Sequence, residues 1–536
     1  MLTATPHPYQ DEAIDGVLDL GYGLVAYEMG LGKTMVGIAV VEELISEPSI
    51  NFALLIVPSN LRWQWAESIA KFTDVDTTTK RVRKRTLTVP TPEWCTVIDG
   101  DPKKRDQQYA YVDKHWPNYV ICSYEQVVND YSLIEALEPE CIILDEATAI
   151  KGFKAKRSQA VKALGEQAKI RVALSGTPLE NKPEEVFSIM EFVEPSILGN
   201  PHQFDAKFIV RNAFGGVKRY RNLDILNKKL SGVMFRKTRL DPDVAPYMPK
   251  VSHKEEYVFL HPKSQRLYDK IGRMALKELM DNQVTGNFDV MSYYQGGDQD
   301  MTAVGKIAAK VMALQMLCDH PDLLKISAQK YYESGGEEGS KFAAQLLEQG
   351  LLDDLGRPEK LLAVCDDVKD ILESNPENKI IIFSFFKDMG EMIQKELQGY
   401  GSVRYNGDMT SNQKSEAKAA FQEDPDVRLF IASDAGAFGV DLPQANYLIN
   451  YDLVESAGQM DQRNARHVRA GSKHKNVFVI NYMIDGSIEE RTFQRLNFKR
   501  KVSGAVIDGD MDATFSELGE IENDVTTLTD WLADTV

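Results

Sequence analysis

A glycine-rich segment near the N-terminus contains residue types that suit the binding of phosphate groups. Residues 24–34 read LVAYEMGLGKT, an apolar run typical of a buried parallel strand that then breaks into Gly30, Gly32, Lys33 and Thr34. The two glycines let the backbone curl so that its N–H groups face phosphate oxygens at the N-terminus of the following helix. Lys33 supplies a positive charge to the terminal phosphates, and the Thr34 hydroxyl can coordinate Mg²⁺. The segment therefore predicts a binding site for a nucleoside triphosphate.

A second segment, IILDEAT at residues 142–148, places two carboxylates at the end of another strand-like run. Asp145 stands where the strand ends and is predicted to hold the metal ion. Glu146 is placed to polarise an attacking water molecule. Together the two segments predict a chain that binds ATP and Mg²⁺ and hydrolyses the nucleotide, as a nucleotide-driven motor does.

One position departs from the strict phosphate-binding pattern. That pattern has a glycine five residues before Gly32, where this chain has Tyr27. A GxGKT sequence and a strand that ends in two carboxylates each occur by chance in other proteins. The prediction of nucleotide hydrolysis therefore depends on the further segments described below.

Length and composition indicate a globular protein with more than one domain. The chain has 536 residues, which is too long for a single hydrophobic core. No apolar run approaches the length of a membrane span, and the start, MLTATPHPYQDEAID, lacks the features of a signal peptide. The five cysteines have no CxxC spacing, so we expect buried free thiols in a reducing compartment. We therefore expect a location that is cytoplasmic, in a bacterium or a virus-infected host cell, or nuclear in a eukaryote, and not secreted.

The net charge of −18 does not exclude nucleic acid as a partner, because binding depends on local patches. Basic clusters occur at residues 80–85 (KRVRKR), 103–105 (KKR) and 218–221 (KRYR). Each alone is more typical of a solvated surface loop than of a phosphate contact. From Asp508 to Asp534 there are nine carboxylates and no Lys or Arg, together with apolar residues such as Trp531. This segment is either a disordered tail or an acidic strap, and as a strap it could bind a protein partner.

Apolar runs alternate with helix-like stretches in two parts of the chain. The runs lie at residues 24–27, 52–57, 95–98, 119–123, 141–144 and 171–174, and again at 379–386, 402–406, 427–432, 446–450 and 476–481. Such alternation is typical of βαβ units and a parallel sheet. From about 183 to 235 and from about 262 to 350 the period is mostly helical, while 296–298 (GGD) and 334–340 (SGGEEGS) indicate loops. The predicted fold class is α/β, with two parallel-sheet lobes and helical insertions between them.

A segment of the second lobe, GQMDQRNARHVRAG at 458–471, is suited to complete the nucleotide site. Gln462, Arg466 and Arg469 fall at i, i+4 and i+7, so we expect all three on one helix face. Because the glycine-rich loop occurs in the first lobe, we expect a cleft between the lobes that closes on the nucleotide. Arg466 and Arg469 would then stabilise charge on the transferred phosphoryl group as arginine fingers. Taken alone, the segment is better explained as a salt-bridged helix face.

From about residue 6 to residue 500 the chain resembles the Swi/Snf-like branch of the superfamily 2 helicase-type ATPases. The most diagnostic stretch is LSGTPLENKPEEVFSIMEFVEP at 174–195, which resembles that branch's coupling motif and the helix after it. Resemblance to its inter-lobe helical region extends over FRKTRLDPDV at 235–244, LHPKSQRLYDKI at 260–271 and LCDHPDLL at 317–324. SIEERTFQRLNFKRK at 487–501 resembles the brace helix that crosses back towards the first lobe.

The resemblance implies roles for individual residues. The catalytic set would be Lys33, Asp145, Glu146, Arg466 and Arg469, with Mg²⁺ held by Thr34 and Asp145. The nucleotide would be bound by Gln10, which reads the base, and by Met29, Gly30, Leu31, Gly32, Lys33, Thr34, Gly439, Asp441 and Gln462. Coupling would depend on Ser175, Gly176 and Thr177, and nucleic-acid contacts on Pro58, Ser59, Ser123, Tyr124 and Ser433. The chain departs from the family's usual residues at Tyr27 (Asp), Thr148 (His or Gln), Asp434 (Arg) and Ala437 (Gly).

The resemblance also implies a domain layout and an activity. We expect a RecA-like lobe 1 at residues 1–240 with a helical insertion at about 183–235, and a RecA-like lobe 2 at 241–505. Lobe 2 would contain a helical insertion at about 262–350 and the brace helix at about 487–501, followed by an acidic C-terminal tail at 506–536. The implied activity is an ATP-dependent translocase on double-stranded DNA that does not need to separate the strands. We expect a monomer without membrane association.

Two other functions remain open on the sequence. The first is a strand-separating helicase on DNA or RNA, although no wedge insertion is recognisable. The second is a catalytically weak DNA- or protein-binding module on the same fold, which is favoured by the departures at Tyr27 and Thr148. The sequence does not indicate the biological pathway, the direction of movement or the step size.

Overall fold

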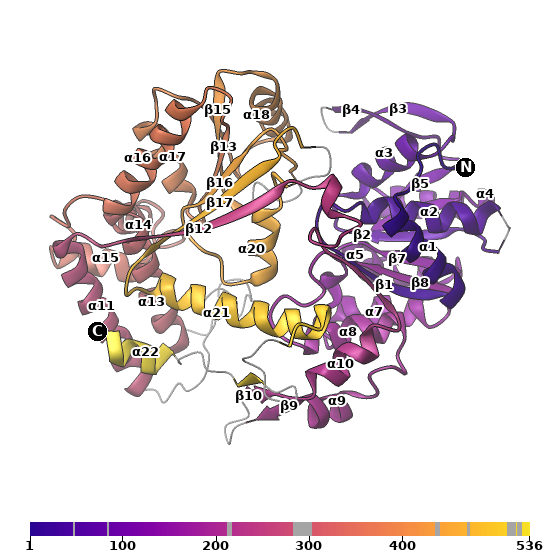
Figure 1. Ribbon diagram of the computed structural model, residues 1–536, viewed down its shortest axis with the longest axis horizontal. Helices are drawn as coiled ribbons and strands as arrows, with labels where there is room; N and C mark the ends of the chain where they lie inside the picture. Colours follow the sequence, from indigo (N-terminus) through magenta and orange to yellow (C-terminus); the bar gives the residue numbers. More distant parts are fainter. Residues whose placement is uncertain are drawn as a thin grey trace.

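The computed structural model describes residues 1–46, 49–82, 85–211, 217–281, 303–434, 440–468, 472–511, 521–522 and 528–535. They form two α/β lobes that lie side by side (Figure 1). The first sheet has seven strands in the order β11 (Met234–Lys237), β1 (Tyr22–Tyr27), β8 (Ile170–Leu174), β7 (Cys141–Leu144), β2 (Ala53–Val57), β6 (Tyr119–Ser123) and β5 (Cys95–Val97). The second has six, in the order β12 (Lys250–Val258), β17 (Asn476–Ile484), β16 (Tyr447–Asn450), β13 (Ile380–Phe383), β15 (Val427–Ala432) and β14 (Gly401–Tyr405).

All strand pairs within these two sheets are parallel, which confirms the predicted α/β class. The eleven apolar runs expected as strands are all strands. β11 and β12 were not expected, and each is an edge strand of its sheet. Because parallel strands share one direction, their carboxyl ends meet along one edge of each sheet, where ligands bind in folds of this kind.

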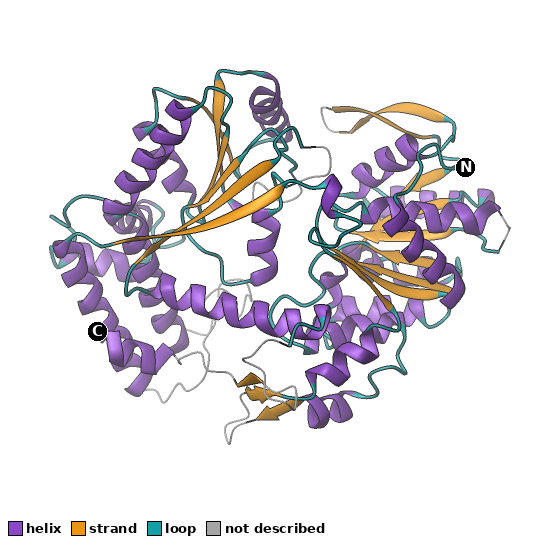
Figure 2. Ribbon diagram, viewed as in Figure 1, coloured by secondary structure: helices purple, strands orange, loops and turns teal. Residues whose placement is uncertain are grey.

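Helices cover both faces of the first sheet (Figure 2). One face packs against α1 (Pro8–Leu20), α2 (Lys33–Ser46) and α3 (Arg62–Phe72). The other packs against α4 (Pro102–His115), α5 (Tyr124–Asn129), α6 (Tyr131–Glu135), α7 (Lys156–Gly165), α8 (Glu184–Val193), α9 (Pro201–Phe208) and α10 (Leu223–Leu230). The central strands β1, β2 and β7 consist almost entirely of apolar residues because both faces of the sheet are buried.

The second sheet is covered by α16 (Glu359–Ser374) and α17 (Lys387–Glu396) on one face and by α18 (Ser411–Glu423) on the other. α20 (Ala457–Asn464) lies on the side of lobe 2 that faces lobe 1 (Figure 1). A helical bundle of α11 (Pro262–Asp281), α13 (Ala303–Asp319), α14 (Pro321–Glu333) and α15 (Lys341–Glu348) is inserted before α16. Residues 334–340 form the expected loop, while 296–298 lie outside the described residues.

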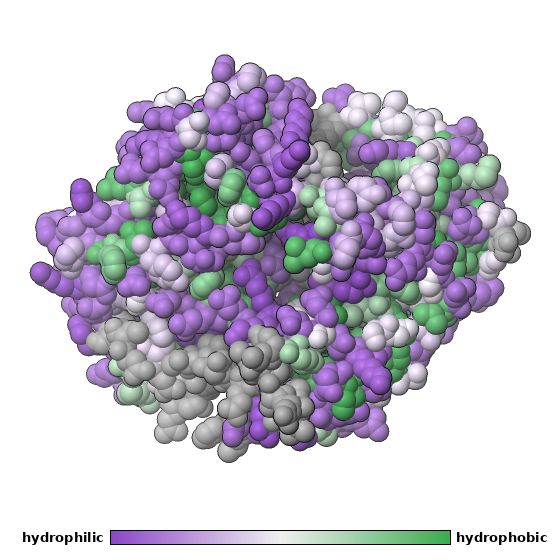
Figure 3. Space-filling model, in the orientation of Figure 1, coloured by the Kyte–Doolittle hydropathy of each residue, from purple (hydrophilic) through white to green (hydrophobic). Residues whose placement is uncertain are grey.

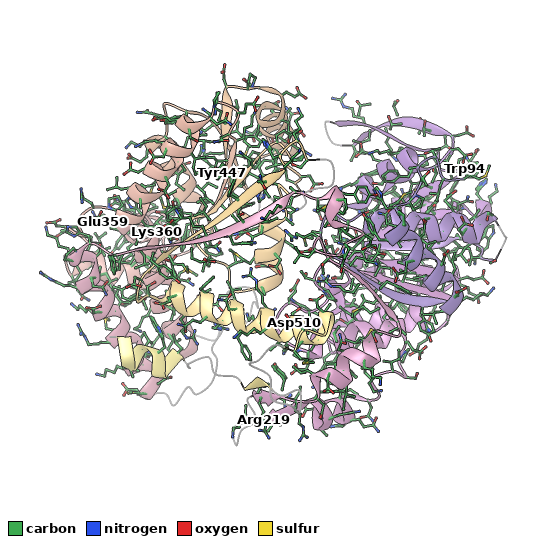
Figure 4. The ribbon with its side chains drawn as sticks, in the orientation of Figure 1. Trp94, Arg219, Glu359, Lys360, Tyr447 and Asp510 are labelled. Carbon is green, nitrogen blue, oxygen red and sulfur yellow. The ribbon has the colours of Figure 1, made fainter. Side chains whose placement is uncertain are left out.

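A buried ion-pair cluster joins this bundle to lobe 2. Lys360, at the start of α16 (Figure 4), has its Nζ 2.9 Å from Asp319 Oδ1 and 2.5 Å from Glu489 Oε1. The three side chains are almost fully buried. Burial raises the pKa of both carboxyls, and the two carboxylates raise that of the lysine despite its burial. One lysine thus fixes α13, α16 and the helix that carries Glu489 relative to one another.

That helix, α21 (Ile488–Ser503), runs from lobe 2 to lobe 1 (Figure 1). The π-helical turn η3 (Gly504–Asp508) continues it and places Val506 and Ile507 in the core of lobe 1. Asn227 of α10 donates from Nδ2 to the carbonyl of Val506 at 3.0 Å, and Asp510 lies against lobe 1 (Figure 4). The chain therefore returns to lobe 1 after completing lobe 2.

The described parts of the acidic C-terminal segment are packed against the rest of the protein. β18 (Ile521–Glu522) pairs with β10 (Val217–Tyr220), which also pairs with β9 (Ile209–Arg211). α22 (Leu528–Thr535) packs on α11 through buried Leu528, Trp531 and Leu532. The helix is therefore held mainly by apolar contacts, and the other residues after 511 lie outside the described part.

The described residues of the basic segment, 80–82 and 85, belong to a hairpin, where a surface loop was expected. β3 (Thr77–Val82) and β4 (Arg85–Pro90) form an antiparallel pair outside the main sheet, packed on α3. All five cysteines are free and buried, as expected. Within the described ranges, no helix is both long enough and apolar enough to cross a membrane.

Candidate nucleotide and nucleic-acid site

The glycine-rich loop connects β1 to α2 and has the backbone conformation needed to surround phosphate groups. Gly30 and Gly32 have φ values of 87° and 78°, in the left-handed region that favours glycine. A Cβ at Gly32 would lie 2.3 Å from Gln10 Nε2, so a side chain there would displace Gln10. With α2 starting at Lys33, the loop directs backbone N–H groups to the helix N-terminus.

Lys33 and the coupling segment meet beside this loop. Lys33 Nζ donates to the Tyr27 carbonyl at 3.0 Å. A Cβ at Gly176 would lie 3.2 Å from Lys33 Nζ and 2.9 Å from Met29 Cγ, so glycine permits this close approach. Ser175 is fully buried, and its N–H donates to Val25 at 3.1 Å. The structure thus brings the loop and residues 175–177 into contact.

Gln10 lies in the first turn of α1, beneath the loop. Its Nε2 donates to the Leu31 carbonyl at 3.0 Å, and its Oε1 accepts from His7 N at 2.8 Å. The side chain is 4% exposed and is bonded at both ends. Gln10 therefore positions the loop, and its contact with the base stays a prediction.

Tyr27, the departure from the glycine pattern, is the last residue of β1 and is fully buried. Its hydroxyl donates to the Tyr9 carbonyl in α1. Burial raises the pKa of the phenol, which keeps it protonated as a donor. Tyr27 therefore ties α1 to the strand that carries the loop.

The loop is also joined to the connection between the lobes. Arg239 lies just after β11, and its N–H and Nε donate to the Glu28 carboxylate at 2.7 Å and 2.9 Å. Arg239 lowers the pKa of Glu28 against the opposing effect of burial. A charged pair thus links the phosphate loop to the chain that leads into lobe 2.

Asp145 follows β7 and is held from two sides. Its Oδ2 accepts from Trp65 Nε1 at 2.7 Å, and its Oδ1 accepts from Glu146 N at 2.9 Å. Burial raises the pKa of Asp145, whereas Trp65 and Lys33 oppose that rise. Trp65 was missed by the sequence reasoning, because nothing in the sequence relates α3 to the end of β7.

Glu146 has an environment suited to a general base. It adopts a left-handed backbone conformation with φ 48°, and its Oε2 is buried without a hydrogen-bond partner among the described residues. Burial, and then the charge of Asp145, raise its pKa to about 7, whereas Lys33 and Arg466 oppose this rise. A carboxyl with a pKa near the working pH is effective in proton transfer. Arg466 comes from lobe 2, so both lobes act on Glu146.

The segment after Glu146 leads back to the coupling motif. Thr148 lies in the short 3₁₀ helix η1 (Ala147–Ile150), where its carbonyl accepts from Lys151 N at 3.1 Å. The Lys151 ammonium pairs with Glu180, which follows the SGTP motif. Thr148 therefore belongs to a turn that connects the metal-side carboxylates to residues 175–180.

The predicted helix face in lobe 2 is wrong. α20 ends at Asn464, so Arg466 lies in the turn beyond it, away from the helical position expected. Asn464 Oδ1 accepts from Asn450 Nδ2 at 3.0 Å, and the Arg466 carbonyl accepts from Leu442 N at 2.9 Å. These tertiary bonds draw the chain out of the helix. Gly439 and Arg469 lie outside the described residues, and Asp441 lies at the edge of the described part.

A cavity of about 930 Å³ lies between the lobes. Lys151 and Glu180 line it from lobe 1, and Ser433, Gln462 and Arg466 line it from lobe 2. In the orientation of Figure 1, the outer surface around the junction of the two lobes is mostly hydrophilic (Figure 3). Ser433, predicted to touch nucleic acid, and Gln462, predicted to touch nucleotide, therefore face one shared space.

Arg463 is a further residue of this region that the sequence reasoning missed. It is 3% exposed, and its Nε and Nη2 each lie 2.5 Å from the Asp434 carboxylate. It also donates to the Asp452 carbonyl at 2.7 Å. Asp434, one of the departures from the family's usual residues, thus pairs with a buried guanidinium from α20. The unusual Asp434 was the signal that could have led to Arg463.

Two of the predicted nucleic-acid contacts do not fit the structure. Ser123 and Tyr124 are 2% and 1% exposed. Ser123 Oγ caps α5 by accepting from Gln126 N at 3.3 Å, and the Tyr124 hydroxyl donates to the Asp145 carbonyl at 2.7 Å. Both side chains position neighbouring segments and cannot reach a nucleic acid in this conformation. Pro58 and exposed Ser59 follow β2 at the surface, where a contact is possible.

Asp145 and Thr34 fit the binding of Mg²⁺. Each Asp145 oxygen accepts one hydrogen bond, which leaves a lone pair on each, and the Trp65 hydrogen bond and the Lys33 charge oppose the rise in pKa that burial causes. Thr34 is in the first turn of α2 beside the loop. Mg²⁺ in nucleotide sites is bound through one or two protein oxygens, with water and phosphate completing its octahedron.

Comparison with known proteins agrees with this arrangement. Residues 19–323 match the SNF2-related domain, and residues 363–471 match the helicase conserved C-terminal domain. The chain is 26% identical over 514 residues to the DNA repair protein rhp54 of Schizosaccharomyces pombe, covering 91% of this chain and 56% of that protein. It is 25% identical to the TATA-binding protein-associated factor mot1 of the same organism, covering 97% of this chain and 27% of that protein.

The chain thus spans about half of the first relative and about a quarter of the second. The solved Pyrococcus furiosus Hef helicase domain has the same fold, with a TM-score of 0.55 at 17% identity, covering 91% of this chain and 98% of that one. The SNF2-related model covers more than half of the 536 residues, in the region that holds the phosphate loop and Glu146. The chain therefore belongs to the SNF2-related family of superfamily 2 helicase-type enzymes, which are DNA-dependent ATP hydrolases.

Proposed function

We propose that this chain is an ATP-dependent double-stranded DNA translocase of the Swi/Snf-like type. It moves along DNA, or remodels complexes bound to DNA, without obligatory strand separation. The observation that carries the proposal is the charge environment of Glu146, which depends on Lys33 of lobe 1 and on Arg466 of lobe 2. Because one catalytic group responds to both lobes, the rate of hydrolysis depends on how the lobes are placed, as a motor requires.

In the nucleotide site, the backbone of residues 29–32 and Lys33 bind the phosphates, and Gln10 lies under the loop on the base side. Asp145 and Thr34 hold Mg²⁺, which when bound neutralises charge on the phosphates. Trp65 fixes the orientation of Asp145 through its 2.7 Å hydrogen bond. With the nucleotide bound in this way, the terminal phosphate would lie beside Glu146.

Glu146 orients the attacking water and accepts its proton. Its unpaired Oε2 is available for that bond, and a pKa of about 7 leaves about half of the carboxyl ionised at neutral pH. Arg466 then stabilises negative charge as the phosphoryl group is transferred, together with Arg469 from the same segment. Gln462, Gly439 and Asp441 complete the lobe 2 side.

Coupling to DNA passes through residues 175–177, which touch the phosphate loop at Gly176. The Lys151–Glu180 pair extends this contact to the inter-lobe cavity, where Ser433 contacts the nucleic-acid backbone. Pro58 and Ser59 provide the corresponding contact on lobe 1. ATP favours the closed arrangement of the lobes, because the closed state binds ATP more tightly. Closure then moves the DNA contacts of one lobe relative to those of the other. DNA as the molecule along which the chain moves is supported by its similarity to a DNA repair protein and to a TATA-binding protein-associated factor.

The first test is the steady-state ATPase rate without nucleic acid and with duplex DNA, single-stranded DNA or duplex RNA, at two salt concentrations. Lys33→Ala, which removes the phosphate-binding charge, supplies the blank. We expect strong stimulation by duplex DNA that weakens as salt rises. Turnover no higher than that of Lys33→Ala on every substrate would refute the motor.

A second measurement separates translocation from unwinding. We expect displacement of a third strand from a triplex on duplex DNA, and no separation of a tailed duplex. Separation of the tailed duplex, or stimulation by single strands or RNA alone, would instead support the strand-separating helicase.

A further inference from the structure

The β3–β4 hairpin is a feature of lobe 1 that the proposed function does not use. Residues 77–92 contain five Lys or Arg residues and no Asp or Glu, in a chain whose net charge is −18. The hairpin lies over α3 and runs from the outer end of lobe 1 towards lobe 2 (Figure 1). So many like charges on one short element destabilise it unless an anion is bound nearby.

The two faces of the hairpin have different compositions. Leu87 and Val89 face α3 and are buried in the lobe 1 core. Because side chains alternate along a strand, Arg81 points to the opposite face, whereas Lys80, whose cross-strand partner is Leu87, lies on the inner side with its exposed side chain over Trp63. That outer face carries Thr77, Thr79, Arg81, Thr86 and Thr88, all of them exposed. It therefore presents hydroxyl groups and a guanidinium, without a carboxylate or an exposed apolar side chain.

The hairpin lies beside the segment that follows β2. Lys80 Nζ is 4.5 Å from the centre of the Trp63 ring. The neighbouring Arg62 donates from Nε to the Ser59 carbonyl at 3.1 Å. The hairpin is thus fixed close to Ser59, at the carboxyl edge of the lobe 1 sheet.

A second basic cluster reaches the same place. Lys103 and Lys104, in the first turn of α4, are exposed, and the Lys104 side chain lies over Gly100. Arg62, next to Trp63, lies 3.5 Å from Asp99, three residues before α4, so the first turn of α4 and Lys80 above Trp63 belong to the same part of the lobe 1 surface. Clusters that are separate in the sequence therefore form one positively charged surface.

Nearby carboxylates do not neutralise this surface. Asp99 is 3.5 Å from Arg62, and Asp101 caps α4 by accepting from Lys104 N at 3.0 Å. Within the described part of the chain, no carboxylate forms an ion pair with Lys80, Arg81, Lys103 or Lys104. The four cations remain available for an external anion.

We propose that the exposed cations of the β3–β4 hairpin and of the first turn of α4 form an additional contact with the phosphate backbone of duplex DNA. Lysine, arginine and threonine side chains are the usual ligands of backbone phosphates. A protein partner would require apolar or aromatic groups at the centre of the surface, which the outer face lacks. The inference rests on the proposed function, since the contact extends the surface of lobe 1 that binds the same DNA.

The test is the salt dependence of duplex binding, measured by fluorescence anisotropy with nucleotide-free protein and a labelled duplex. The variants are Lys80→Gln/Arg81→Gln on the hairpin and Lys103→Gln/Lys104→Gln on α4. Each lost phosphate contact should reduce the slope of log Kd against log salt by about 0.9, so each double variant should lose up to about 2. The matched control is Lys277→Gln/Lys395→Gln, which removes two exposed lysines from lobe 2.

We expect each basic-surface variant to bind DNA about tenfold more weakly near 150 mM salt and the control to match the wild type. The α4 variant provides an independent result if the hairpin variant fails to fold, which circular dichroism reveals. If both variants have the same slope of log Kd against log salt as the wild type, the additional contact is refuted and the proposed function is unaffected. Failure of the wild type to bind duplex DNA would refute the proposed function itself.

Discussion

The raised pKa of Glu146 predicts that this residue reduces the stability of the protein at neutral and alkaline pH. Its carboxyl has an ordinary pKa of 4.5, which the folded protein raises to about 7, first through burial and then through Asp145. The folded state therefore binds a proton more tightly than the unfolded state. The free energy of unfolding must fall as pH rises from the unfolded value to the folded value. Glu146→Gln removes the charge and should increase stability.

The size of the effect follows from the two pKa values. Each pKa unit corresponds to about 1.4 kcal/mol, so a rise from 4.5 to about 7 amounts to roughly 3 kcal/mol once Glu146 is ionised. Glu146 therefore lowers the free energy of unfolding by about 1 kcal/mol at pH 5, where the folded-state carboxyl is still protonated, and by about 3 kcal/mol at pH 8. For a lobe of this size, Glu146→Gln should therefore raise the Tm by about 2–4 °C at pH 5 and by about 6–12 °C at pH 8.

The assay is thermal unfolding of nucleotide-free protein, followed by circular dichroism at pH 5 and pH 8 at one heating rate. Glu93→Gln, which changes an exposed carboxylate in the same lobe, is the matched control and should show no such difference between the two pH values. An equal rise in Tm at both pH values for Glu146→Gln would refute the argument. In that case Glu146 would not be ionised in a buried environment.

Three further predictions concern catalysis and the buried ion pairs. The ratio kcat/KM for ATP should rise about tenfold between pH 6 and pH 8 as Glu146 loses its proton, and a flat profile would rule out Glu146 as the base. Trp65→Phe removes the donor to Asp145, so half-maximal ATPase activity should need about ten times more Mg²⁺ at nearly unchanged Tm; an unchanged Mg²⁺ requirement would contradict this role. Lys360→Met leaves two buried carboxylates without their cation and should lower the free energy of unfolding by about 3–5 kcal/mol in urea titrations at pH 8. A loss below about 1 kcal/mol would show that the lysine adds little to stability.

The sequence predicted the strands that are buried on both faces. Runs such as 52–57 and 380–383 are apolar throughout because helices cover both sides of each sheet, and this makes them recognisable without alternation. The phosphate loop was equally recognisable, because its backbone conformation requires glycine at Gly30 and Gly32. Where a structure depends on local requirements of this kind, the residue types alone predict it.

Features that depend on tertiary contacts could not be predicted from the residue types. β12 is an edge strand with mostly exposed side chains, so its charged sequence KVSHKEEYV follows no strand pattern. The end of α20 depends on hydrogen bonds from Asn450 and Leu442, which are remote in the sequence. The burial of Tyr124 depends on the position of Asp145. Each of these required the folded structure, because the deciding partner lies in another segment.

The connection between the lobes determines how the molecule bears mechanical load. β11 at one end and β12 at the other are edge strands paired in parallel with their sheets, and β12 matches β17 over nine residues. A force that pulls the lobes apart therefore acts along these strands and loads their hydrogen bonds in shear, all together, not one after another as in unzipping. The Glu28–Arg239 pair attaches the phosphate loop to this load path. Tension on the DNA would thus reach the nucleotide site directly, making the rate of hydrolysis sensitive to the opposing force.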